Sequence, residues 1–199
     1  GGATSAIKKG LSLLNQVLTY LPMLGEAKVL LAQTQLLLNP DHPELATNLL
    51  QQRLKEEPSD VDAHLLLASI ALAGQNYRLA TSSLEQALSY DFTVRSLPWY
   101  QLLKGQLLSR YDQLDDALAV LQEALSCSAV RATLGLSGMM RGVMKGDGEG
   151  DGGKHGASMD ECAALYIETV HVFAALYRLP EAKELAAQAR GVFKSTEWE

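Results

Sequence analysis

Residues 60–91 read DVDAHLLLASIALAGQNYRLATSSLEQALSYD and contain the pattern that decides the fold. In the second half of this stretch, Ala80, Leu84 and Ala87 follow the spacing A-x3-L-x2-A, which puts a small, a large and a small apolar side chain on one face of a helix. Small side chains let two helix axes approach closely, so this helix is expected to press against the leucine-rich helix before it. Residues 74–76 (GQN) are expected to form the turn between the two helices.

The same spacing recurs before and after this stretch, at intervals close to a tetratricopeptide repeat of roughly 34 residues. Ala117, Leu121 and Ala124 repeat it, and a degenerate copy precedes Pro58. Such helix pairs stack because one pair alone cannot bury its apolar face. The expected structural repeat positions are Ala46, Leu50, Pro58, Ala80, Leu84, Ala87, Gly105, Ala117, Leu121, Ala124 and Ala182.

These patterns predict an all-α protein, a right-handed tetratricopeptide-repeat solenoid of antiparallel helix pairs joined by short links. Helices are expected over 4–20, 26–38, 43–57, 60–74, 77–90, 97–110, 114–127, 159–178 and 180–195, with N-caps at Ser59-Asp60 and at Asp160. Three parts are expected: an array of about three and a half units over 1–131, a flexible Gly/Asp-rich insertion over 132–158, and a further helix pair over 159–199 that continues the array.

Composition and charge argue against several functional classes. The net charge is −6 and the pI about 5.2, whereas a nucleic-acid-binding domain needs clustered Lys and Arg. Apolar runs such as 65–73 are too short for a membrane span. Phosphate-binding and nucleophile-elbow motifs are missing, and residues 134–138 (LGLSG) lack flanking strand signals. We therefore expect no enzyme, no cofactor, no nucleic-acid partner and no transmembrane segment.

Metal sites are also not expected. Residues 147–152 (DGEGDG) imitate the opening of a calcium loop, but the twelfth position, which needs a bidentate Glu, is Ser158. His64 and His171 have no second His or Cys at helical spacing. A calcium-responsive regulator would show a calcium-dependent melting shift, and we expect none.

The concave face of the predicted array is the expected partner-binding surface. Its candidate residues are Lys28, Gln35, Asp62, Ser69, Trp99, Gln106 and Arg110. Co-chaperone repeat domains bind an acidic C-terminal peptide there through Lys, Asn and Arg side chains. Here only Lys28 and Arg110 are basic, and no Asn is present, so a carboxylate would lack its paired donors. This inventory disfavours a soluble peptide-binding module of the co-chaperone type, which is the alternative interpretation.

Three segments carry a family resemblance: DAHLLLA (62–68), LEQALSYDFTVR (84–95) and PWYQLLK (98–104). In this order they resemble the tetratricopeptide repeat domain 21 family, also called intraflagellar transport protein 139, the large repeat subunit of intraflagellar transport complex A. The resemblance is best over about residues 60–130. Its specific part is the junction SYDF-x-VR followed by P-x-Y, which no general repeat rule requires.

The resemblance implies a fragment of a non-catalytic scaffold or adaptor in complex A. Such a protein supports retrograde ciliary transport and the ciliary entry of membrane cargo through protein–protein contacts. The implied partners are the other complex A subunits and, indirectly, dynein-2 and membrane cargo. The implied location is the cilium or flagellum and the basal body, on the cytoplasmic side.

Overall fold

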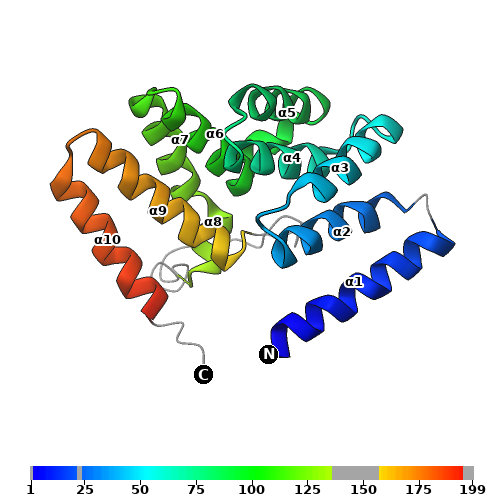
Figure 1. Cartoon of the computed structure of the whole chain (residues 1–199). Coiled ribbons are helices and arrows are strands. Elements are labelled where there is room, and N and C mark those ends of the chain that lie inside the picture. Colours follow the sequence, from blue (N-terminus) through cyan, green and yellow to red (C-terminus); the bar gives the residue numbers. More distant parts are fainter. Residues whose placement is uncertain (1, 22–23, 136–156, 195–199) are drawn as a thin grey trace, which may run out of the picture. The chain divides into compact units, whose positions relative to one another are not determined.

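The structure, a computed structural model, describes residues 2–21, 24–135 and 157–194 (Figure 1). Within these residues the chain is helical and has no strand. The helices are α1 Gly2–Tyr20, α2 Gly25–Leu38, α3 Glu44–Glu56, α4 Val61–Ala73, α5 Tyr77–Tyr90, the 3-10 helix η1 Phe92–Ser96, α6 Pro98–Arg110, α7 Leu114–Ser126, α8 Ser128–Thr133, α9 Met159–Ala175 and α10 Leu179–Lys194.

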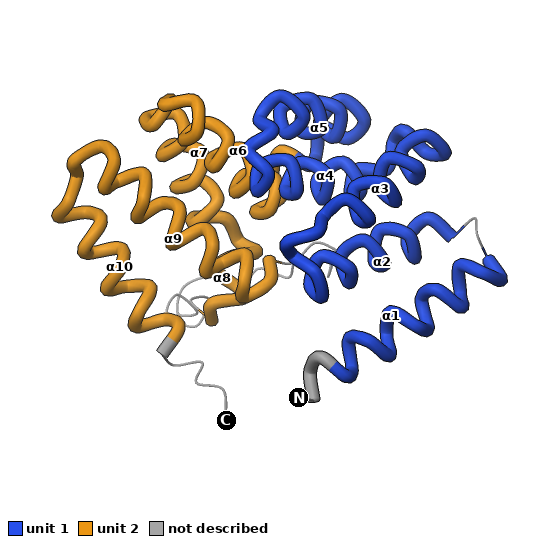
Figure 2. Tube along the Cα trace, viewed as in Figure 1, with its two compact units in different colours: residues 1–94 blue, residues 95–199 orange. Residues whose placement is uncertain are grey.

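The chain divides into two compact units, residues 1–94 and 95–199 (Figure 2). In unit 1, α2 packs on α3 and α4 on α5, while α1 lies against α2. In unit 2, α6 packs on α7 and α10 on α9, and α9 also contacts both α6 and α7. Consecutive helices therefore form antiparallel pairs in both units, which confirms the predicted all-α, tetratricopeptide-type architecture.

The nine helices expected from the sequence are present, and their ends lie within a few residues of the expected ones. Two short helices, η1 and α8, are not among the nine expected ones, because such short elements carry little apolar periodicity. Asp60 caps α4 as expected, since its Oδ1 accepts a hydrogen bond from the Ala63 N–H at 3.0 Å. The expected cap at Asp160 was wrong: Ser158 caps α9 and forms a capping box with Glu161.

The repeat positions lie in the two cores, with one exception. In unit 1, the side chains at 46, 50, 80, 84 and 87 are at most 2% exposed, and in unit 2 those at 117, 121 and 124 are completely buried. Ala182 is buried on α10. Pro58 is exposed, and it acts through its backbone: His64 Nε2 donates to the Pro58 carbonyl at 2.9 Å.

Two helices of unit 2 approach each other closely at Gly105 on α6. A Cβ atom at this position would lie 2.6 Å from Cγ and Cδ2 of Leu121 on α7, a distance that real Cβ atoms do not adopt. Leu121 is itself fully buried, so its side chain cannot move away into solvent. Glycine is therefore the residue that allows α6 and α7 to pack at this distance.

Three of the four pairs share one turn geometry. Gln75, Asp112 and Tyr177 have positive φ values of 58°, 60° and 58°, in the turns α4–α5, α6–α7 and α9–α10 respectively. In each turn the next residue donates its N–H to the carbonyl five positions earlier, at distances of 2.7, 3.0 and 2.9 Å. The α9–α10 pair is therefore built like the pairs before the insertion, although none of the three turns has glycine at the left-handed position.

Two ion pairs connect α3 to its neighbours in unit 1. Lys28 on α2 is only 8% exposed, and its Nζ lies 2.5 Å from Glu56 Oε2. Arg53 Nε donates to Asp60 Oδ2 at 2.7 Å, so the carboxylate that caps α4 also binds α3. The Arg53 guanidinium also fills the space beside Gly25, where an added Cβ would overlap it.

The predicted insertion lies mostly in residues 136–156, outside the described part of the chain, and so does the calcium-loop-like stretch 147–152. Its two ends are described and are hydrogen-bonded to each other. Thr133 Oγ1, at the end of α8, donates to the Ala157 carbonyl at 2.8 Å. Val130 and Ala157 are both buried in the core of unit 2, so the two described ends of the insertion lie together in that core.

We predict opposite effects for the same substitution at two helical glycines. Gly105→Ala overpacks the contact with Leu121, which costs about 1–3 kcal/mol and outweighs the helix-propensity gain of up to about 1 kcal/mol. Gly191→Ala on α10 meets open space, so it should stabilise by about 0.5–1 kcal/mol. Urea unfolding followed by circular dichroism measures both midpoints; a higher midpoint for Gly105→Ala would contradict the close approach.

A second prediction concerns pH. A hydrogen bond from Lys28 holds the pKa of Glu56 below its ordinary value of 4.5. A carboxyl group with a lowered folded-state pKa stabilises the fold above its unfolded pKa, and this contribution is lost as the pH falls through the folded value. At neutral pH the wild-type chain should therefore have a higher melting temperature than the Glu56→Gln variant. This difference in melting temperature should disappear as the pH falls below 4.5 and Glu56 becomes protonated. Thermal melts across this range test it, with exposed Glu85→Gln as the control; a difference that persists in acid would disprove the assignment.

Candidate protein-interaction surfaces

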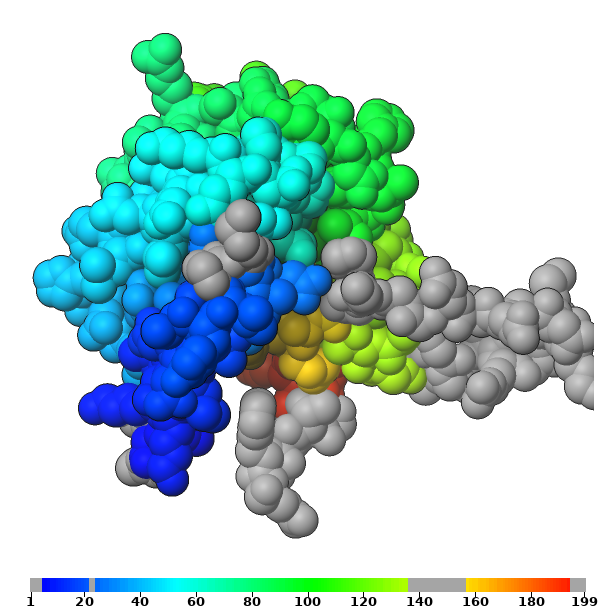
Figure 3. All heavy atoms as spheres, turned by 90° about the vertical axis from the view of Figure 1, so that its right-hand side faces the viewer, coloured from blue at the N-terminus to red at the C-terminus, as the bar shows by residue number. Residues whose placement is uncertain are grey.

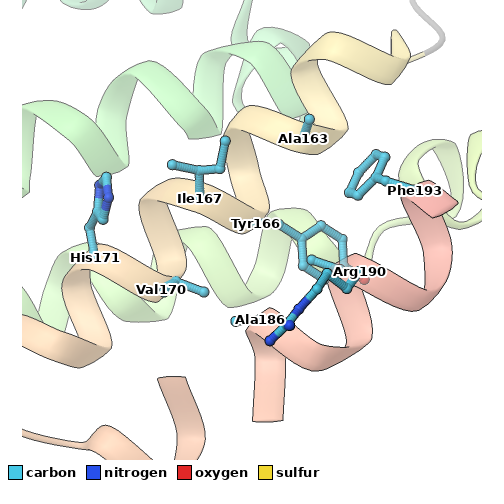
Figure 4. A pocket seen from close by; sticks show the side chains of 9 residues that line it. Ala163, Tyr166, Ile167, Val170, His171, Ala186, Arg190 and Phe193 are labelled. Carbon is cyan, nitrogen blue, oxygen red and sulfur yellow. The ribbon is translucent and has the colours of Figure 1, made fainter. Parts of the chain in front are cut away.

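Unit 2 has an apolar groove of about 440 Å³ between α9 and α10 (Figure 4). Both helices supply its walls with small or apolar side chains, and two basic side chains lie at its edge. The lining residues are Ala163, Tyr166, Ile167, Val170, His171, Ala186, Ala189, Arg190 and Phe193. Ile167 is the most exposed large apolar side chain among them, at 56%.

The spacing of these residues explains why they share one face. On α9, positions 163, 167 and 170 follow the i, i+4, i+7 pattern, and on α10 positions 186, 189 and 193 follow i, i+3, i+7. The three alanines leave room between the helices, while larger side chains close the bottom. Tyr166 and Phe193 meet edge to face there, with ring centroids 5.9 Å apart and an interplanar angle of 88°.

Desolvation dominates the electrostatics below the groove. Burial raises the pKa of the Cys162 thiol to about 11, helped by the neighbouring Glu161. Burial also raises the pKa of Tyr166, with a further contribution from Cys162. Both groups stay neutral at physiological pH, so neither adds a charge at or beside the groove.

The turn that positions α10 is held by a polar cluster outside the groove. Arg178 Nε lies 2.9 Å from Glu181 Oε1, and the guanidinium stacks 5.0 Å from the centre of the Phe173 ring. The pKa of Glu181 is lowered, first by its own backbone N–H and then by Arg178. A carboxylate in the first turn also complements the helix dipole, so this cluster favours the start of α10.

A second apolar surface lies in unit 1, on helix α1. This helix is the blue N-terminal part of the chain in Figure 3. Leu13, Val17 and Tyr20 lie at i, i+4, i+7 and are 61%, 37% and 83% exposed. Leu14 and Leu18, on the side toward α2, are half-buried. The helix is therefore apolar on two sides, and in unit 1 only one of them is covered.

The predicted partner-binding residues of unit 1 are in different environments. Lys28 is buried and paired with Glu56, and Asp62 is exposed at the start of α4. Ser69 is half-buried, and its hydroxyl donates to the Leu66 carbonyl at 2.8 Å. Gln35 has a buried Oε1 with no hydrogen-bond donor among the described atoms. These residues remain predictions for partner binding.

The predicted residues of unit 2 all lie on α6. Trp99 is half-buried and packs against the core of unit 2, Gln106 is half-buried, and Arg110 is exposed at the end of the helix. Neither Trp99 nor Arg110 lines the groove between α9 and α10. Sequence reasoning missed that groove because it considered only the first helices of the three pairs before the insertion; the apolar spacing in 163–170 and 186–193 is the signal that could have shown it.

The described residues contain no group of three or more His, Cys, Asp or Glu side chains that could hold a metal ion. Among these residues, no helix combines the length and the apolar character that crossing a bilayer requires. The described surface offers to other molecules one apolar groove in unit 2 and one apolar stripe in unit 1.

Comparisons of fold place the chain among helical repeat proteins. The MamA RS-1 ArsTM double mutant aligns with a TM-score of 0.62 and 13% identity over 97% of this chain and 88% of its own. A thermophilic TPR protein of Thermus thermophilus aligns with a TM-score of 0.55 and 19% identity over 96% of this chain and 92% of its own. At such identities the likeness shows the fold alone.

Comparisons of sequence are more specific. Human tetratricopeptide repeat protein 21B is 36% identical over 125 residues, which is 63% of this chain and 9% of the relative. Human tetratricopeptide repeat protein 21A is 31% identical over 129 residues, 65% of this chain and 10% of the relative. The chain thus spans about a tenth of the length of these relatives. Two family models match it: the tetratricopeptide repeat protein 21 ARM repeat over residues 92–199 and the second ARM domain of the same protein over residues 2–75. Because these matches cover more than half of the chain and fall on both compact units, the chain belongs to the tetratricopeptide repeat protein 21 family.

Proposed function

We propose that this chain is a non-catalytic scaffold segment of intraflagellar transport complex A. The observation that carries the proposal is the pair of family matches, one on each compact unit, in a chain whose described residues form stacked helix pairs. A fold of this kind acts by presenting surfaces, because each helix pair leaves one face for a neighbour and one for a partner. The segment then supports retrograde ciliary transport and the entry of membrane cargo through protein–protein contacts.

The partners that follow are the other complex A subunits and, through them, dynein-2 and membrane cargo. The location that follows is the cilium or flagellum and the basal body, on the cytoplasmic side. Two apolar surfaces support this proposal: the groove of unit 2 and the α1 stripe of unit 1. Exposed apolar patches bordered by polar residues are typical of interaction sites.

The alternative is a co-chaperone type of module that binds an acidic C-terminal peptide. Such binding requires cationic side chains that are free to reach a carboxylate. Lys28, the basic candidate in unit 1, is buried and engaged by Glu56. Arg110, the other candidate, belongs to unit 2. The charge distribution therefore favours the scaffold over the peptide clamp.

The proposal predicts the outcome of an affinity purification. The tagged chain, added to an extract of ciliated cells, should enrich the other complex A subunits, as read by mass spectrometry. A tagged tetratricopeptide domain from an unrelated protein is the control for non-specific binding. Enrichment of chaperones through their acidic tails, with complex A subunits at the control level, would refute the scaffold and favour the alternative.

A further inference from the structure

The turn that joins α9 to α10 in unit 2 contains an aromatic residue, Tyr177 (Figure 1 shows the turn). Tyr177 is 89% exposed, which is the largest exposed fraction among the large apolar side chains of the described residues. Its side chain has no hydrogen bond and no ring contact with a described residue. Leu179 is 52% exposed, and Pro180 is exposed as well. These three residues form an apolar projection, which we call the α9–α10 tip.

The backbone at Tyr177 lies in the left-handed region, with a φ of 58°. Bulky residues avoid this region because their Cβ comes too close to the following carbonyl oxygen, whereas glycine and asparagine adopt it readily. Packing of the ring does not offset this cost, because the ring is exposed and buries little apolar area. The stability of the fold therefore does not explain a tyrosine here, and residues held in such conformations cluster at functional sites.

The two equivalent turns have polar side chains at the left-handed position. Gln75 and Asp112 share this conformation, and both are exposed. Asp112 joins α6 to α7, and the following pair packs on these two helices through α9 within unit 2. A following pair thus contacts the helix faces and leaves the turn residue in solvent. By the same geometry, a further pair stacked on α9 and α10 would leave Tyr177 exposed.

The α9–α10 tip is held in place and has no uncompensated charge. Arg178, which lies between Tyr177 and Leu179, donates its backbone N–H to the Phe173 carbonyl at 2.9 Å. The Arg178 side chain is paired with Glu181 and stacks on the Phe173 ring. A rigid projection loses little conformational entropy on binding, and an apolar one is complementary to an apolar pocket rather than to a charged surface. Tyrosine is also among the residues that contribute most to binding energy, because a large ring and a hydroxyl act together.

We propose that the α9–α10 tip is an anchor that inserts into an apolar pocket of a partner protein, where the Tyr177 hydroxyl donates a hydrogen bond to an acceptor inside the pocket. The assignment rests on the proposed scaffold function and names the surface that contacts one of its partners. The hollow that a second copy of the chain could offer is the groove between α9 and α10, which is a face of the kind that covers a neighbouring repeat. The partner is therefore a different protein.

Thermal melts of the 199-residue chain test whether Tyr177 is kept at a cost to stability. Tyr177→Gly should raise the melting temperature by about 1–4 °C, because glycine adopts the left-handed conformation without a Cβ contact. Gln75→Gly in the α4–α5 turn is the matched control and should give a rise of similar size. A lower melting temperature for Tyr177→Gly alone would show that the ring stabilises the fold, and it would overturn the proposal.

Photo-crosslinking in ciliated cells tests the anchor itself. A photoreactive phenylalanine derivative replaces Tyr177 in the full-length natural protein, and the crosslinked peptides are sequenced. A second form carries the same derivative at Gln75, which has the same backbone conformation in another turn. Position 177 should crosslink to apolar residues of one other protein, while position 75 stays at background. A crosslink from position 177 to the same chain or to a second copy, or no crosslink above background, would overturn the proposal.

Affinity purification of full-length variants separates the anchor from the scaffold function. Tyr177→Gly should lower the recovery of the crosslinked protein about tenfold, Tyr177→Phe should lower it less, and Gln75→Gly should leave it unchanged. Unchanged recovery with Tyr177→Gly contradicts the anchor. Complex A subunits in the same purifications test the scaffold function by themselves. Their recovery without a crosslink at position 177 refutes the anchor alone, and a crosslinked protein without complex A subunits refutes the scaffold alone.

Discussion

Close packing of helix pairs on small side chains is the constraint on which this structure depends. At Gly105 the α6 backbone lies so near Leu121 that no side chain fits, and the alanines at 80, 87, 117 and 124 are completely buried in their own units. The short distances let leucines such as Leu84 and Leu121 fill the space between crossings. A helix pair built in this way is thin, so each pair must find its remaining apolar contacts on a neighbouring pair.

The same constraint explains the surfaces that remain open. A pair whose outer face lacks a neighbour within its unit exposes the small and apolar side chains that would otherwise be covered, as the α9–α10 groove and the α1 stripe do. The shared turn geometry at Gln75, Asp112 and Tyr177 shows that the α9–α10 pair is built like the α4–α5 and α6–α7 pairs. Its exposed floor is thus a face of the kind that covers a neighbouring repeat, and no described residue of unit 2 fills it.

The helices could be predicted from the sequence because apolar periodicity over twelve or more residues is a strong local signal. The alternating Ala and Leu of 80–87 and 117–124 gave both the helix type and the buried face. Short elements were missed. The predicted cap of α9 was Asp160 and the observed cap is Ser158. The prediction chose the wrong residue because several polar residues near the start of this helix could have capped it. Lys28 shows the limit most clearly: it was expected on a binding face, and it lies buried against Glu56, a residue 28 positions away.

By itself, the sequence determined the helical class, the repeat length, the buried face of the second helices and, through the junction at 84–104, the family. These properties depend on residues that are close in the chain or repeated along it. Only the tertiary structure decided which surfaces stay open and which charges are free. Such properties depend on pairs such as Lys28 with Glu56 and Ile167 with Ala186, which are brought together by packing and not by spacing. A local pattern cannot specify them, because the same exposed leucine or lysine pattern fits both a covered and an open face.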